Sequence, residues 1–331
     1  MNGSVLITGG AGFIGFHLAR SLVNFGHRVH LVDNHARGRM DKDLQKLLAH
    51  PSITFSRIDL MDYKSLSKLG NNYSAVYHLA AIIGVSHVSD RPYEVLVNNI
   101  RMLENIIRFT KIQQHFQRLF YASTSEVYAG ALKHFDLEIP SPESASLAVT
   151  DLSDKRTTYM MSKITGEAMC HHSGVPFTIF RPHNIYGPRM GMAHVIPEQL
   201  QNIWDAGRRS KVGVYSVDHR RTFCYIDDAV EMLIRMLTNK LSVGQTLNIG
   251  TESPEVTIRE VVEICIEVAK KNITIEALPP TPGSPTRRAP NMLLTKQLLK
   301  YESATCLREG ITKTWKWYKA NVFDSSQASA S

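Results

Sequence analysis

The chain has 331 residues, of which 43% are hydrophobic and 21% charged, as in an ordinary globular protein of one large or two joined domains. Its formal net charge is +8, but the basic residues are dispersed along the sequence, which argues against a nucleic-acid-binding stripe and suits a cleft for an acidic small molecule. No apolar run reaches the ~20 residues of a membrane span, no signal peptide precedes the first strand, and the four cysteines are scattered, so we expect a cytoplasmic protein without membrane contact, disulfide framework or metal site.

The first predicted element is a strand at residues 5–7 that stops at a glycine-rich turn, after which apolar residues recur at helical spacing. Gly9 would allow a positive φ in the turn, Gly12 would leave room for a pyrophosphate, and Gly15 would let the helix pack closely on the strand. The anion would bind the free N–H groups at the helix N-terminus, where the sequence has Phe13 and Ile14.

A second apolar strand at residues 29–32 ends in Asp33, which lies 18 residues past Gly15. A dinucleotide-binding unit places at this point the carboxylate that accepts the adenosine ribose hydroxyls, and Asn34 follows it. Because a carboxylate disfavours a 2′-phosphate, the pattern predicts NAD(H). Arg37 and Arg39 follow closely, however, and keep NADP(H) open as an alternative.

Strands and helices continue to alternate to about residue 180, which predicts an α/β protein with a doubly wound parallel sheet. The third strand, at residues 53–58, leads into Asp59 and Leu60, placed to meet the edge and face of the adenine. The fourth, at residues 76–81, contains His78, which we interpret as a core histidine because no acid or nucleophile accompanies it. The backbone at the end of this strand is expected to approach the cofactor, at Leu79, Ala80 and Ala81.

The predicted helix at residues 93–111 carries Asn99, a poor helix former that we expect to bond backbone near the site, with a solvent-facing position as the alternative. The strand at residues 119–122 opens into a hydroxyl and carboxylate cluster that would lie in the ligand crevice at the carboxyl ends of the strands. Residues 130–156 predict a long excursion over the site. Tyr159 and Lys163 then open a helix one turn apart, so their phenol and ammonium share a face.

These motifs together resemble the extended short-chain dehydrogenase/reductase family, in particular its nucleotide-sugar epimerases, dehydratases and decarboxylases. The resemblance covers nearly the whole chain to Tyr318 and includes residues 8–15, 78–81, 123–128, 181–188 and 221–228, with Asp33, Asp59, Leu60, Tyr159 and Lys163.

The resemblance implies a Rossmann-type NAD-binding domain over residues 1–176, completed by about residues 222–250. A smaller C-terminal α+β substrate-binding domain would occupy mainly residues 177–323, and residues 324–331 would form a disordered tail.

The resemblance also implies catalytic roles. Tyr159 would be the base that takes the proton of the C4 hydroxyl of a sugar, while Thr124 bonds the same oxygen. Lys163 would lower the pKa of the Tyr159 phenol and hold the nicotinamide ribose. Ser123 and Asn99 would contribute to the cofactor site. Glu126 would be a second acid or base, as in sugar dehydratases and glucuronate decarboxylases.

For the substrate, a diphosphate-linked sugar with UDP favoured, the resemblance implies contacts by Ser125, Asn184, Arg189, Arg221 and Arg288. Arg287 could exchange roles with Arg288. The sequence therefore predicts an NAD-dependent nucleotide-sugar epimerase or dehydratase acting through transient oxidation at C4. The alternatives are a UDP-glucuronate decarboxylase-like enzyme and a non-catalytic dinucleotide-binding regulator. A homodimer is expected through the helices at residues 93–111 and 157–170.

Overall fold

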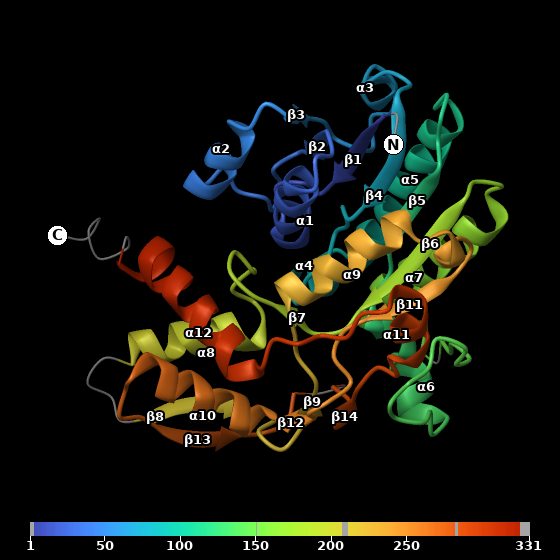
Figure 1. The fold of residues 1–331 in the computed structure, drawn as a ribbon. Coiled ribbons are helices and arrows are strands. Elements are labelled where there is room, and N and C mark those ends of the chain that lie inside the picture. The colour runs from blue at the N-terminus through green and yellow to red at the C-terminus, as the bar shows by residue number, and fades with distance from the viewer. Residues whose placement is uncertain (1–2, 150, 207–210, 282–283, 325–331) are drawn as a thin grey trace.

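A seven-stranded, wholly parallel sheet forms the upper part of the molecule in the computed structural model, which describes residues 3–149, 151–206, 211–281 and 284–324 (Figure 1). Its strand order is β11-β6-β5-β4-β1-β2-β3. The strand order reverses between β1 and β4, where an open α/β sheet has its ligand crevice. The strands are β1 (Ser4–Thr8), β2 (Val29–Asp33), β3 (Ile53–Arg57), β4 (Tyr73–His78), β5 (Arg118–Ala122), β6 (Phe177–Pro182) and β11 (Thr246–Ile249).

Alternation of side chains along these strands divides the core between the two faces of the sheet. Val5 and Ile7 join a cluster with α1 (Phe13–Asn24) and α9 (Ile226–Thr238), whereas Leu6 joins a cluster with α5 (Pro92–Lys111) and α7 (Lys155–His172). Because both faces are covered by helices, every residue of the central strands β4 and β5 is buried, and the predicted doubly wound sheet is confirmed.

The smaller part, at the bottom of Figure 1, is built on short strands and helices that share the first of these clusters. Two parallel strands, β8 (Lys211–Tyr215) and β13 (Thr274–Leu278), pair there, and β9 (Arg220–Arg221) lies between β12 (Val256–Thr257) and β14 (Arg287–Arg288). The helices of this part are α8 (Val195–Asp205), α10 (Ile258–Ala269), α12 (Leu307–Tyr318) and the π-helical turn η3 (Lys319–Phe323).

Short elements complete the described chain. They are α2 (Lys42–Leu48), α3 (Tyr63–Ser67), α4 (Val85–Asp90), η1 (Ser125–Tyr128), α6 (Ala129–His134), β7 (Ile185–Tyr186), β10 (Cys224–Tyr225), η2 (Lys240–Ser242) and α11 (Leu293–Leu299).

The division of the chain between the two parts differs from the expected one at one point. β11 and α9 return to the large unit, as expected, but β6 begins at Phe177 and also belongs to the seven-stranded sheet. The chain therefore enters the smaller part only after Pro182. The excursion at residues 130–156 contains most of α6 and the first two residues of α7, and the rest of its described residues are irregular. Most of the predicted tail lies outside the described residues.

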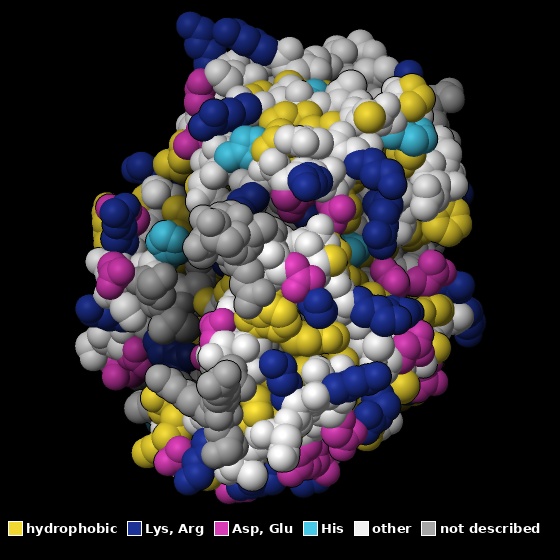
Figure 2. All heavy atoms as spheres, turned by 90° about the vertical axis from the view of Figure 1, so that its left-hand side faces the viewer, with side chains coloured by type: hydrophobic (Ala, Val, Ile, Leu, Met, Phe, Trp, Pro, Cys, Tyr) yellow, Lys and Arg dark blue, Asp and Glu magenta, His cyan; other side chains and the backbone are white. Residues whose placement is uncertain are grey.

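The distribution of surface charge and the state of the cysteines concern the functions that the sequence argued against, namely nucleic-acid binding, a disulfide framework and a metal site. On the face drawn in Figure 2, Lys and Arg side chains are scattered among Asp and Glu, without forming one stripe. Cys170, Cys224 and Cys265 are buried free thiols and Cys306 is exposed. None of the helices in the described ranges is long and apolar enough to cross a membrane, and those ranges hold no cluster of three or more His, Cys, Asp or Glu suited to a metal ion.

Candidate active site

The glycine-rich turn joins β1 to α1 at the point where the strand order reverses. Gly9 has φ +70°, and a Cβ on it would lie 2.9 Å from the Ala80 nitrogen, while a Cβ on Gly15 would collide with the Gly9 carbonyl. Gly12 is the N-cap of α1 and supplies no side-chain cap to the helix. The predicted turn and packing roles of Gly9 and Gly15 are confirmed. The uncapped helix start at Phe13 and Ile14 fits the pyrophosphate of a dinucleotide.

The predicted adenosine contacts gather at the ends of the neighbouring strands β2 and β3. The two carboxylate oxygens of Asp33 accept hydrogen bonds from the backbone N–H groups of Ala11, at 3.1 Å, and His35, at 2.8 Å. Asn34 donates to Asp59 at 3.4 Å, and both residues are exposed. Leu60 is only 4% exposed and its side chain packs in the core, and its contact with the adenine stays a prediction.

The end of β4 is shaped by contacts within the protein. His78 is buried and bonded to the Thr8 hydroxyl at 2.8 Å, as predicted for a core histidine, and burial lowers its pKa to about 3. The backbone that approaches Ala80 is that of Gly9, while Leu79 and Ala81 are half-buried.

Asn99 lies behind this segment. Its side-chain oxygen accepts from the Ile82 N–H at 2.8 Å, and its amide nitrogen donates to the Ile82 carbonyl at 3.1 Å and to Ser162 at 3.2 Å. The expectation that Asn99 bonds backbone is confirmed. Because Asn99 is itself buried, it shapes the loop that borders the cleft.

Thr124, Tyr159 and Lys163 come together at the end of β5, as the spacing predicted. Thr124 hydrogen-bonds the Tyr159 hydroxyl. The Lys163 amine donates to the Ala122 carbonyl at 2.7 Å and lies 5.9 Å from the centre of the Tyr159 ring. The structure thus brings the predicted base, its hydroxyl partner and the predicted cation to one place.

The protonation of this group differs from the expectation. Burial raises the pKa of the Tyr159 phenol, as does the negative charge of Glu126, while the Thr124 hydrogen bond and the charge of Arg37 oppose the rise. Lys163 is not among the groups that lower the pKa of Tyr159, and burial lowers its own pKa to about 8. The phenol is therefore protonated at neutral pH in the ligand-free protein.

Glu126 stands between Tyr159 and a pair of arginines. Arg288 and Arg221 occupy paired positions on the parallel strands β14 and β9, and a guanidinium nitrogen of Arg288 donates to Glu126 at 2.5 Å. The charge of Arg288 is the largest influence on the pKa of Glu126, which it holds below its ordinary value. Burial and the neighbouring charge of Arg288 lower the pKa of Arg221 to about 10.

Arg287 faces elsewhere: its guanidinium pairs with Glu255 at 2.5 Å. The structure thus separates the two candidates that the sequence left open, since only Arg288 contacts Glu126.

Asn184 and Ser125 are each connected to the group formed by Glu126, Arg221 and Arg288. Asn184 has φ +41° and donates to the Thr222 carbonyl at 2.9 Å, next to Arg221 in sequence. Ser125 is buried beside Glu126 in η1.

Two further predicted site residues have their side chains bonded within the protein. The Ser123 hydroxyl is buried and donates to Glu167 at 2.5 Å, and its contact with the cofactor stays a prediction. The Arg189 side chain is 4% exposed, donates to Asp41 at 2.8 Å and stacks 4.1 Å from the Phe16 ring centre. Arg189 therefore joins the segment after β7 to the dinucleotide-binding part. One of its guanidinium nitrogens is buried without a hydrogen-bond partner, and its contact with the sugar stays a prediction.

A buried ion pair behind the site was missed in the sequence. Arg181 of β6 donates through two nitrogens to the Glu167 carboxylate of α7, at 2.9 and 2.6 Å, and through a third to the Tyr128 hydroxyl at 2.7 Å. The signal in the sequence was an arginine directly after the apolar run at residues 177–180, because a buried charge requires a partner.

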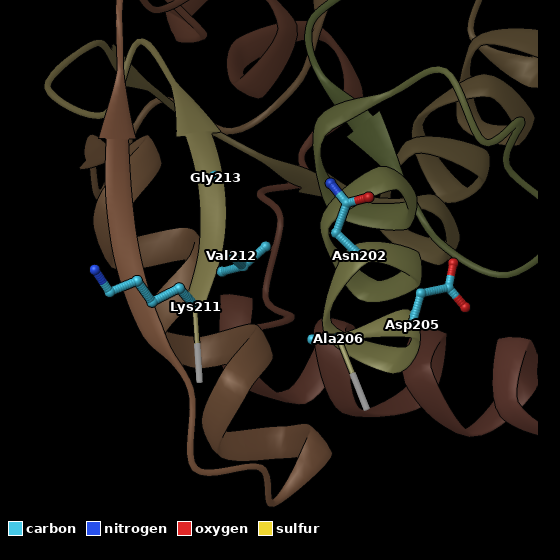
Figure 3. Close-up of a pocket in the computed structure, with 6 residues that line it drawn as sticks. All are labelled: Asn202, Asp205, Ala206, Lys211, Val212 and Gly213. Atoms are coloured by element: carbon cyan, nitrogen blue, oxygen red, sulfur yellow. The ribbon is translucent and has the colours of Figure 1, made fainter. Parts of the chain in front are cut away.

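A hollow elsewhere in the smaller part does not belong to this site. It lies between the end of α8 and β8, and Figure 3 shows the residues that line it, Asn202, Asp205, Ala206, Lys211, Val212 and Gly213. None of the predicted site residues is among them.

Comparison with known proteins agrees with this arrangement. The model of the NAD dependent epimerase/dehydratase family matches residues 5–250. A UDP-N-acetyl-alpha-D-glucosaminuronate decarboxylase of Bacillus cytotoxicus is 31% identical, over 95% of this chain and 97% of its own. UDP-glucuronic acid decarboxylase 1 of Arabidopsis thaliana is 29% identical, over 98% of this chain and 71% of its own. Among solved structures, a UDP-glucuronic acid 4-epimerase of Bacillus cereus, in complex with UDP-glucuronic acid and NAD, is 25% identical, with a TM-score of 0.80 over 96% of this chain and 99% of its own.

Proposed function

The chain belongs to the NAD dependent epimerase/dehydratase family, and from this premise we propose that it removes the carboxyl group of a UDP-linked uronic acid through a transient ketone at C4. The family confirms the predicted NAD-dependent nucleotide-sugar enzyme. Within it, the alternative that the sequence raised, decarboxylation, is now preferred over epimerisation and dehydration. The observation that carries this preference is the carboxylate of Glu126, held by Arg288 beside Arg221 and next to Tyr159.

In the proposed reaction Tyr159, bonded to Thr124, takes the proton of the C4 hydroxyl. NAD, when bound, supplies the hydride acceptor for C4 and a positive charge near the phenol. Oxidation makes C4 a ketone, and the carboxylate on C5 becomes that of a β-keto acid. The bond between C5 and C6 then breaks, carbon dioxide leaves, and the electron pair is delocalised towards the C4 oxygen. Protonation at C5 and reduction at C4 complete the turnover.

The residues around Glu126 suit this leaving group. Carbon dioxide departs without protonation, whereas expulsion of a C6 hydroxyl, as in dehydration, needs an acid. The chain departs here from dehydratases of the thymidine-sugar type, which have Asp-Glu at this point, because a buried serine, Ser125, precedes Glu126. Glu126, which is ionised because of Arg288, can accept or return a proton at C5.

The substrate's charges are matched by the cations of the same site. Arg221, Arg288 and Asn184 are proposed to bind the diphosphate, because guanidinium groups match phosphate geometry. A uronate carries one more negative charge than a neutral sugar. The pKa of Arg221 is lowered first by burial and then by the positive charge of Arg288. A doubly charged diphosphate and a carboxylate would relieve that repulsion.

A second candidate is 4-epimerisation of the same sugar acid, favoured by the likeness to the Bacillus cereus 4-epimerase. It needs the same C4 oxidation but returns the hydride to the opposite face of the ketone. The non-catalytic alternative is opposed by the intact grouping of Thr124, Tyr159 and Lys163.

The test is to incubate the purified protein with UDP-glucuronate, UDP-N-acetylglucosaminuronate and neutral nucleotide sugars and to read product masses. We expect loss of the mass of carbon dioxide from a uronate. Loss of water would indicate dehydration, and an unchanged mass with a new sugar would indicate epimerisation. Tyr159→Phe should keep NAD binding and lower turnover by at least about 100-fold. Conversion of none of these sugars would contradict the proposal.

A further inference from the structure

Arg37 is a charged residue near the site to which the proposed reaction gives no task. It lies four residues past the end of β2, in the loop that follows the proposed ribose carboxylate Asp33. A backbone position this close to Asp33 would suit a contact with a 2′-phosphate, which is why the sequence left NADP(H) open. The direction of the Arg37 side chain in the structure points to a different role.

The loop that carries Arg37 is fixed on the glycine-rich turn. Gly38 packs against Ala11 so closely that a Cβ on it would lie 2.6 Å from the Ala11 Cβ. The His35 ring bonds the Gly38 carbonyl at 3.0 Å, and Arg189 donates to the Arg39 carbonyl at 3.4 Å. Arg37 therefore starts directly above the turn in which the pyrophosphate of a dinucleotide would bind.

From this position the side chain reaches across the crevice. A guanidinium nitrogen of Arg37 donates to the Ile83 carbonyl, at 3.3 Å, in the loop after β4. Because β1 lies between β2 and β4 in the sheet, the side chain crosses the carboxyl end of β1. Its other nitrogen comes near Gly191, 3.8 Å from where a Cβ would stand. Arg37 thus joins the loop after β2 to the loop after β4 and lies near Gly191.

The charge of Arg37 is not neutralised by the protein. No carboxylate in the described part of the chain forms an ion pair with it, whereas Arg288 and Arg189 each have one. The groups that face it are the Tyr159 phenol and His194, whose pKa is lowered by burial and by the charge of Arg37. An exposed guanidinium above an uncapped helix start is a site for a diphosphate.

We propose that Arg37 is an anion latch for the cofactor, which pairs with the NAD pyrophosphate and, by its bond to the Ile83 loop, keeps the dinucleotide in the crevice during turnover. Such a latch suits chemistry in which the same cofactor must take and return a hydride. The inference rests on the NAD of the family and is independent of which sugar is the substrate.

The experiment compares NAD release from Arg37→Ala with release from the wild type and from Arg39→Ala, which removes a charge from the same loop. The cofactor is loaded as NADH, which carries the same pyrophosphate as NAD and is fluorescent, and its dissociation is followed by fluorescence without any sugar. The NAD that stays bound through purification is also measured. We expect about tenfold or faster release from Arg37→Ala, an intermediate rate from Arg37→Lys and an unchanged rate from Arg39→Ala.

Three results would overturn the latch. The first is equal release from Arg37→Ala and the wild type. The second is an equally faster release from Arg39→Ala, which would indicate a general effect of charge. The third is a loss confined to NADP binding, which would identify Arg37 as a 2′-phosphate contact. Thermal unfolding of each variant without cofactor confirms that the fold is intact. Since no sugar is present, failure of the proposed decarboxylation leaves this test unaffected.

Discussion

Tyr159 and Lys163 share one face of α7, yet burial moves their pKa values in opposite directions. The Tyr159 phenol becomes harder to ionise, and the Lys163 ammonium, 3% exposed, loses its proton near pH 8. Desolvation disfavours the charged form of each group, so the acid becomes weaker and so does the base. The phenolate needed for catalysis must therefore form when the bound ligands change the charges around it.

The pKa of Lys163 predicts a pH dependence of stability. It is about 8 in the folded protein and 10.5 as an ordinary value, so between these pH values the unfolded chain binds more protons. Stability contributed by this group therefore rises with pH across that window. Urea unfolding at pH 8, 9 and 10 measures the free energy of unfolding of the wild type and of Lys163→Met. The wild-type value minus the variant value should increase by on the order of 2–3 kcal/mol from pH 8 to pH 10. A difference that stays constant over this range would refute the assignment.

At the scale of residues, the sequence predicted which site side chains lie together where local geometry determines their neighbours. Tyr159 and Lys163 lie one helical turn apart, and Thr124 and Glu126 follow a strand end, so their grouping follows from the fold class. The partners of Ser123 and Arg189, Glu167 and Asp41, were not predicted because they lie far away in the sequence. No local pattern indicates which way such a side chain turns.

At the scale of elements, α7 is joined to β6 by the buried pair of Glu167 and Arg181. Glu167 also accepts a hydrogen bond from Ser123, directly after β5, and Arg181 donates one to Tyr128 of η1. The pair therefore holds in place the strand end and the helix that carry the proposed catalytic group. Since both charges are buried, each depends on the other for its compensation.

Breaking this pair should be costly. Glu167→Gln leaves the Arg181 guanidinium buried without its counter-charge, and we expect a loss of about 3 kcal/mol in the free energy of unfolding, measured by denaturant titration. The matched control is Glu309→Gln, which breaks an exposed pair with Lys313 within α12 and should cost less than about 0.5 kcal/mol. An equal loss of unfolding free energy in the two variants would show that the buried pair does not stabilise the contact between α7 and β6.

The elements themselves were largely predictable, because apolar periodicity and glycines determine them locally. Strands β1, β2, β3 and β5 and helix α5 lie within a residue or two of the expected bounds, while β4 begins three residues earlier. The place of β6 between β5 and β11 was not predicted, since it depends on pairing between distant segments, which no single segment encodes.

At the scale of the whole molecule, the helices α5 and α7 pack against each other and leave apolar side chains at the surface. Leu96, Val97, Ile100, Met161 and Ile164 are half-buried, and within the described residues they belong to neither core cluster. A second copy of the chain would cover them, in agreement with the homodimer that we propose from the sequence.

Sedimentation velocity tests this proposal. The wild type should sediment as a dimer, and Ile100→Glu, which places a charge on the proposed interface, should sediment as a monomer. Leu293→Glu, at an exposed leucine of α11, is the control and should remain dimeric. A monomeric wild type at micromolar concentration would contradict the homodimer.

The most direct test of the whole account is rapid mixing of the NAD-loaded protein with UDP-glucuronate that carries either hydrogen or deuterium at C4, with absorbance recording the reduced cofactor. We predict a reduced-cofactor signal that forms more slowly with the deuterated sugar and disappears as the decarboxylated product accumulates. Product formed at the same rate from both sugars, without any reduced cofactor at any time, would contradict oxidation at C4 and with it the role proposed for Tyr159.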